Sequence, residues 1–186
     1  GFLLTRRPES ASTAGPVTRF SIVLPAGQQV APGAGTIALS PDGRELVVVV
    51  EEERGQLGPA DNVSVLYRRP LDALAAKPIA GTEDGGKPFF SPDGDWVAFI
   101  SSRDGTLKKV SLRGGTPADI APVNGQFRGG VWAGDDWITY VTGWAVLRVR
   151  AEGGSTENLL SHAQMDAQKG FLWYDTLGTL PGTSSF

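Results

Sequence analysis

Short apolar runs follow closely spaced turn residues, and this arrangement recurs along the chain. The clearest example is Ser91-Pro92-Asp93-Gly94, with an apolar run at 96–100 directly behind it. The same four residues occur earlier as Ser40-Pro41-Asp42-Gly43, before an apolar run at 46–50. Apolar residues on both sides of a reverse turn predict a hairpin between two buried strands. A third, altered copy lies at 133–141.

The four turn residues each suit a reverse turn for a different physical reason. A serine hydroxyl at the first position can accept hydrogen bonds from the backbone ahead of it. Proline fixes φ for the second position, and glycine at the fourth allows a positive φ without a Cβ clash. One such turn is a weak signal, but its recurrence within a larger repeated pattern is a strong one.

Each repeat is predicted to hold four strands. They cover 36–40, 45–51, 63–69 and 77–80 in the first repeat, 87–91, 95–101, 106–112 and 117–121 in the second, and 130–133, 136–142, 145–151 and 156–160 in the third. The glycine pairs Gly114-Gly115 and Gly153-Gly154 predict hairpin turns before the last strand, because both positions tolerate a positive φ. The glycine pairs at 85–86 and 129–130 are interpreted as turns too.

The repeat length and the strand pattern together indicate the fold class. Four-stranded units that recur every roughly 40–50 residues are typical of propeller blades. The second strand of each unit is apolar throughout, as expected where neighbouring blades cover both faces, whereas the third strand alternates. We therefore predict an all-β fold: a partial β-propeller of four-stranded antiparallel blades at about 36–81, 87–122 and 128–161, with an incomplete blade at 169–186.

The Ser-Pro-Asp-Gly hairpins, supported by the Gly-Gly turns, resemble the WD-repeat-like units of TolB-type β-propellers across residues 17–186. The resemblance implies a parent propeller of about six blades. It also implies that the strand at 17–24 closes the last blade. The longer arrangement is similar to the C-terminal part of bacterial membrane-anchored serine/threonine kinases, where a propeller follows a membrane helix and a linker.

The first residues fit that kinase arrangement. Residues 1–7 are apolar and then abruptly basic, as at the end of a membrane helix, although a ragged start to the chain fits them equally well. Residues 8–16 are rich in Ser, Ala, Gly and Pro and read as a flexible linker. We expect a membrane-anchored protein whose propeller lies outside the cytoplasm, with a soluble periplasmic protein as the alternative. Any membrane contact is expected only through that N-terminal helix.

Composition narrows the possible chemistry. The chain has 17 basic and 20 acidic residues without a long basic run, so nucleic acid is not an expected partner. One histidine, His162, and no cysteine give no usual zinc site. Neither a nucleophile elbow nor a phosphate loop occurs in the sequence. We predict no catalytic residue, no metal ligand and no cofactor, and we interpret the aspartates of the turns as structural.

The five tryptophans are the remaining candidates for binding. Trp96 and Trp137 hold equivalent positions at the start of an apolar strand, which favours packing between blades. Trp144 lies in a tight connection and is the candidate for a contact surface. Three functions stay open: a recognition or sensor module for a protein, peptide or glycan ligand, the accessory propeller of a serine peptidase, and a TolB-like protein-interaction domain.

Overall fold

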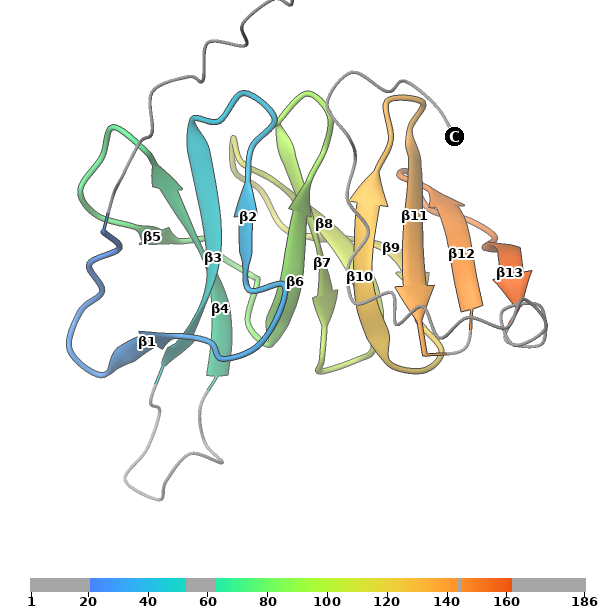
Figure 1. Ribbon diagram of the computed structural model, residues 1–186, viewed down its shortest axis with the longest axis horizontal. Helices are drawn as coiled ribbons and strands as arrows, with labels where there is room; N and C mark the ends of the chain where they lie inside the picture. The colour runs from blue at the N-terminus through green and yellow to red at the C-terminus, as the bar shows by residue number, and fades with distance from the viewer. Residues whose placement is uncertain (1–20, 53–62, 144, 162–186) are drawn as a thin grey trace, which may run out of the picture.

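The described part of the chain forms three antiparallel β-sheets that stand side by side (Figure 1). The structure is a computed structural model that describes residues 21–52, 63–143 and 145–161. Within these ranges every regular element is a strand, and no helix is long and apolar enough to span a membrane. The predicted all-β class is confirmed, and the sheets are called the first, second and third blades in chain order.

The second and third blades are simple four-stranded meanders in which each strand pairs with the next one along the chain. The second blade contains β6 (Gly85–Phe90), β7 (Trp96–Ser101), β8 (Thr106–Ser111) and β9 (Ala118–Pro122). The third contains β10 (Phe127–Trp132), β11 (Trp137–Thr142), β12 (Ala145–Arg150) and β13 (Glu157–Ser161). Every pairing is antiparallel, as the hairpin turns predict.

The first blade has five strands, one more than the sequence predicts. They are β1 (Gln28–Val30), β2 (Ile37–Leu39), β3 (Glu45–Glu52), β4 (Val63–Pro70) and β5 (Lys77–Pro78). The short strands β1 and β2 share one edge of the long strand β3. The connection between them contains Gly33 and Gly35, whose φ values of +108° and +74° suit glycine. The unpredicted strand is therefore the first half of a divided inner strand.

The described end of the predicted closing strand lies against the first blade. Val23 forms an isolated parallel bridge with Ala75. Leu24 packs against the buried cluster on this blade that includes Val48, Val50 and Tyr67. Residues 17–20 lie outside the described residues, as do 1–16 and the predicted incomplete blade at 169–186. The role of the strand in closing a last blade stays a prediction.

The core lies in layers between neighbouring blades. Between the first and second blades, Val47 and Leu66 pack against Val97 and Phe99. Between the second and third blades, the packed layer includes Leu107 and Tyr140, and a larger set completes it: Ala98, Ile120, Ala121, Phe127, Trp132, Ile138, Val149 and Ala151. Strand β7 of the middle blade is buried on both faces at Val97, Ala98 and Phe99, because a blade lies on each side of it. Each core layer therefore depends on the register of two blades at once.

The glycine pairs interpreted as turns lie inside strands instead, at the start of β6 and within β10. A Cβ on Gly85 would lie 2.6 Å from Leu66 Cδ1 and 2.7 Å from the carbonyl oxygen of Thr82. A Cβ on Gly130 would lie 2.9 Å from the ring of Phe89 in the neighbouring blade. Glycine within a strand often marks a close approach of other atoms. At these two positions glycine serves the contact between blades and does not make a turn.

Candidate functional site

The turn at 40–43 is held by hydrogen bonds of its serine and aspartate. The backbone N–H of Gly43 donates to the carbonyl of Ser40 over 2.9 Å, and Gly43 has a φ of +71°. The Ser40 hydroxyl oxygen accepts from the backbone N–H of Glu45 over 2.8 Å and donates to Asp42 over 2.6 Å. The hydrogen bond that the Ser40 hydroxyl donates lowers the pKa of the Asp42 carboxyl. Pro41 occupies the second position of this turn.

The turn at 91–94 repeats this geometry. Gly94 donates its backbone N–H to the carbonyl of Ser91 over 3.0 Å and has a φ of +76°. The Ser91 hydroxyl oxygen accepts from the backbone N–H of Trp96 over 2.9 Å, so the turn fixes where this tryptophan begins β7. The Ser91 hydroxyl donates to Asp93, and this hydrogen bond lowers the pKa of that carboxyl. Pro92 is exposed on the outside of the turn.

The third turn is shorter and uses a different residue for the positive φ. Ala133 donates its backbone N–H to the carbonyl of Trp137 over 2.8 Å. Asp136 has a φ of +62°, a conformation that aspartate tolerates better than most residues with a side chain. The loss of serine and proline therefore leaves the hairpin in place. The glycine pairs Gly114-Gly115 and Gly153-Gly154 all have positive φ values, between +96° and +118°.

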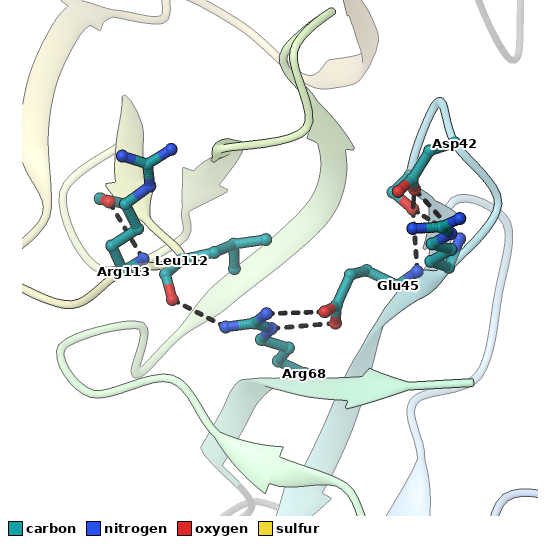
Figure 2. A network of polar contacts seen from close by, with 8 residues as sticks. Asp42, Glu45, Arg68, Leu112 and Arg113 are labelled. Atoms are coloured by element: carbon teal, nitrogen blue, oxygen red, sulfur yellow. Dashed lines mark hydrogen bonds and ion pairs between the residues drawn. The ribbon is translucent and has the colours of Figure 1, made fainter. Parts of the chain in front are cut away.

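An arginine joins the first blade to the second (Figure 2). Arg68 on β4 donates to both carboxylate oxygens of Glu45, over 2.9 Å from Nε and 2.6 Å from Nη2. Its third nitrogen, Nη1, donates to the carbonyl of Leu112 in the second blade over 2.8 Å. The planar guanidinium thus satisfies a carboxylate and a carbonyl at the same time. This three-residue contact is called the Arg68 clamp.

A basic residue recurs at the position of Arg68 in the other two blades. Arg68 is paired in register with the third residue of β3, and Lys109 and Arg148 are paired with the third residues of β7 and β11. The first residues of these strands are Glu45, Trp96 and Trp137. Each basic side chain lies against that first residue, as an ion pair in the first blade and over an indole ring in the others. The register therefore makes the three pairs structurally equivalent.

Lys109 lacks the partners that Arg68 has. Its ammonium lies 5.1 Å from the ring centroid of Trp96 and 5.9 Å from that of Trp132. Neither a hydrogen bond nor an ion pair of this ammonium occurs within the described residues. Trp132 is 7% exposed, and its buried Nε1 has no hydrogen-bond partner. A buried indole donor without a partner and a partly exposed ammonium without an ion pair therefore lie between the second and third blades.

These residues line a cleft of about 320 Å³ between the second and third blades. The turn of the second blade forms one wall, and the two turns of the third blade form the other. The lining consists of Ser91, Pro92, Asp93, Trp96, Lys109, Trp132, Gly134, Asp136, Ala151 and Glu152. Two aromatic side chains with a few polar groups around them are typical of a small-ligand site. This site is called the blade 2–3 cleft.

The charges of the blade 2–3 cleft are unevenly placed. Lys109 lies between the two indole rings and is half-buried. The acidic lining residues Asp93, Asp136 and Glu152 are exposed and belong to the turns. The cleft therefore presents one positive charge near its aromatic walls and three negative charges on the turns around it. A purely anionic group would meet more like charges than opposite ones there.

The sequence interpretation assigned Trp96 to packing between blades, and the structure adds a place in the lining of the cleft. It did not identify Lys109 or Glu152. The signal that could have found Lys109 is the basic residue at the same position of every third strand. Trp144 and His162 lie outside the described residues, so their proposed roles stay predictions. In the described ranges, no group of three or more His, Asp or Glu side chains could hold a metal ion.

Comparisons with known proteins connect this arrangement to solved structures. No protein-family model matches the chain, and no curated protein matches it. A protein described as TolB from Agrobacterium tumefaciens is 22% identical, with a TM-score of 0.51, over 66% of this chain and 47% of that chain. The β-propeller domain of the Trilobed protease from Pyrococcus furiosus is 16% identical, with a TM-score of 0.51, over 66% and 41%.

An enzyme appears among the similar structures as well. Oligogalacturonate lyase from Vibrio parahaemolyticus is 14% identical, with a TM-score of 0.55, over 75% of this chain and 43% of that chain. This chain therefore covers less than half the length of each of the three structures. At such identities the likeness concerns the fold alone. The similar structures are TolB-like and other β-propeller proteins, which agrees with the three blades described above. The chain therefore has the fold of part of a β-propeller.

Proposed function

We propose that this chain is a non-catalytic recognition module that binds its ligand in the blade 2–3 cleft. The observation that carries the proposal is the Lys109 ammonium beside the rings of Trp96 and Trp132, in a cleft large enough for a few ligand atoms. This ammonium makes no ion pair within the described residues, so its charge is free to take an acceptor from a ligand. The protein, peptide or glycan ligand expected from the sequence would supply the missing acceptor.

The lack of candidate catalytic groups supports a binding role. The sequence holds one histidine and no cysteine, and the aspartates of the first two turns are engaged by serine hydroxyls. We expect the purified chain to show neither kinase nor hydrolase turnover. Robust turnover that His162→Ala abolishes would contradict the proposal, whereas the same substitution is expected to leave ligand binding intact.

The cellular setting is proposed from the sequence. The apolar-to-basic change at 2–7 and the strand-like stretch at 19–24 fit the propeller of a bacterial membrane-bound serine/threonine kinase, where the module would be a sensor outside the cytoplasm. Reading the open reading frame on both sides of this segment tests that setting. An upstream kinase domain and membrane helix would support it, and a signal peptide directly upstream would favour a soluble periplasmic protein.

The second candidate is the accessory propeller of a serine peptidase. The structures of similar fold include the β-propeller domain of the Trilobed protease from Pyrococcus furiosus and a puromycin-hydrolyzing peptidase from Mycobacterium tuberculosis. A downstream Gly-x-Ser-x-Gly segment in the same reading frame would favour this role. In that setting the blade 2–3 cleft would contact substrate peptide and would not act as a sensor.

Binding at the cleft is tested by NMR on the whole chain, labelled with ¹⁵N. Tryptophan indole N–H signals are well separated from backbone amides, and single Trp→Phe substitutions assign those of Trp96 and Trp132. We expect members of a mixed panel of short peptides and oligosaccharides to shift these two signals selectively. The Trp137 indole, on the opposite face of the third blade, is the internal control. If no panel member moves the two cleft signals more than the Trp137 signal, the proposal is wrong.

A further inference from the structure

The Arg68 clamp indicates what the blade 2–3 cleft lacks. Between the first and second blades, the basic residue contacts the Glu45 carboxylate and the Leu112 carbonyl. Between the second and third blades, the basic residue is Lys109 and the residue in place of Glu45 is Trp96, so the carboxylate is missing. Trp96 and Lys109 both line the cleft, so the lining holds the ammonium without the carboxylate that accompanies Arg68.

The residue that faces the basic side chain from the next blade is also equivalent at the two interfaces. Leu112 and Ala151 each donate a backbone N–H to the carbonyl of the residue that precedes the second strand, Asp95 in one blade and Asp136 in the other. Ala151 therefore matches Leu112, and it lines the blade 2–3 cleft. The cleft contains the same backbone frame as the clamp, with a lysine that has no hydrogen bond to the facing backbone among the described residues.

We infer that the blade 2–3 cleft binds a carboxylate of a peptide ligand, and that this carboxylate pairs with Lys109 as Glu45 pairs with Arg68. The inference rests on the proposed recognition function and specifies its ligand. Trp96 and Trp132 provide apolar walls beside the lysine. The ligand carboxylate thus replaces an interaction that the chain itself makes one blade earlier.

The acidic residues of the turns narrow the ligand further. Asp93, Asp136 and Glu152 line the same cleft as Lys109, so the lining as a whole is acidic. A polyanion such as an acidic polysaccharide would meet three like charges for one opposite charge. A peptide that carries a basic side chain next to its carboxylate offers both signs of charge and amide donors. We therefore assign the cleft to a mixed-charge peptide segment.

The test uses three defined peptides on the whole chain. Acetyl-Lys-Glu-amide carries a side-chain carboxylate, acetyl-Gly-Lys with a free C-terminus carries an α-carboxylate, and acetyl-Lys-Gln-amide is the control without a carboxylate. The Kd of each is measured from the indole signals of Trp96 and Trp132. We expect at least one carboxylate peptide to bind about fivefold tighter than the control or better, as for a charge pair at the edge of an interface. Either carboxylate source supports the inference.

Variants of the lysine supply the decisive comparison. Lys109→Met keeps the apolar stem and removes the charge, so the ratio of the Kd of the control peptide to that of a carboxylate peptide should fall to about one. The dispersion of the amide signals checks that this variant is still folded. Lys109→Arg should keep the preference. The double variant Trp96→Glu/Lys109→Arg places the residues of the Arg68 clamp at this interface, and its own carboxylate should abolish binding of the carboxylate peptides.

The possible failures are distinguishable. If neither carboxylate peptide binds more tightly than the glutamine peptide, although all three shift the two indole signals, the cleft binds ligands but does not select a carboxylate, which overturns the inference and leaves the recognition function standing. If Lys109→Met keeps a fivefold preference, the lysine is not the partner and the inference is also overturned. If no peptide or oligosaccharide moves either signal, both this inference and the recognition function fail.

Discussion

Replacing Arg68 by methionine should loosen the contact between the first two blades. The substitution keeps an unbranched apolar stem and removes two hydrogen bonds to Glu45 and one to the backbone carbonyl of Leu112. The Arg68 side chain is 36% exposed and that of Glu45 is 20% exposed, so solvent screens part of the ion pair. We expect about 1 kcal/mol from the pair after this discount and about 1 kcal/mol from the carbonyl bond.

A loss of about 2 kcal/mol corresponds to a fall in Tm of about 4–8 °C for a chain of this size. The measurement is thermal and urea unfolding followed by circular dichroism, with a double-mutant cycle against Glu45→Gln to isolate the coupling of the pair. Raising the salt concentration should weaken that coupling only in part, since the pair is half-buried.

Arg148→Met is the matched control for this prediction. Arg148 holds the same register position, pairs with Glu157, and has a side-chain exposure of 38%. It makes no backbone contact to another blade within the described ranges. We expect a loss of about 1 kcal/mol, about 0.5 kcal/mol from the exposed pair and about 0.5 kcal/mol from the contact with the Trp137 ring. If the two substitutions lower Tm equally, the contact between blades contributes nothing beyond a surface ion pair, and the reasoning about the Arg68 clamp is wrong.

Three further changes test other parts of the structure. Gly85→Ala should cost about 1–3 kcal/mol in urea unfolding by overpacking the blade contact, whereas Gly86→Ala, whose Cβ would meet nothing closer than 4.0 Å, should be near neutral; equal costs would refute the close-approach explanation. Gly94→Val should cost about 1–3 kcal/mol because its φ is +76°, and an unchanged Tm would show that the turn does not need that conformation. The Lys108 ammonium lowers the pKa of Asp104 to about 2, so the stability from this pair is present above the unfolded pKa of 3.8 and is lost as pH falls toward 2. Lys108→Met should accordingly lose less stability than the parent chain on acidification from pH 4 to pH 2, and an identical loss would contradict the pairing.

The features that the sequence predicts well are those that depend on neighbouring residues. The apolar run at 46–50 is buried in β3, because a strand covered on both faces must be apolar in every position. Alternation in β12 likewise leaves Val149 buried and Arg150 exposed. Local chemistry also fixes the turns, where serine and glycine carry out roles that depend on four or five consecutive residues.

The features that the sequence does not reveal depend on contacts between blades. Gly85 and Gly130 look like turn residues until the atoms that face them from another blade are known. Strand β1 is short and polar, and it forms because β3 is longer than β2 and leaves an open edge. At the blade 2–3 cleft a lysine and a tryptophan stand in the register positions of the arginine and glutamate of the clamp. That comparison requires the pairing register of three sheets, which repeat spacing alone does not supply.

A crystal structure of the whole chain with acetyl-Lys-Glu-amide tests most directly whether this propeller fragment recognises ligands through the blade 2–3 cleft. We expect the peptide between the second and third blades, with its glutamate carboxylate within hydrogen-bond distance of Lys109 Nζ and its lysine facing the acidic turns. A peptide bound elsewhere on the blades, or a cleft that stays empty at saturating concentrations of this peptide and of acetyl-Gly-Lys while Lys109 keeps its place over Trp96, would contradict carboxylate recognition by the cleft.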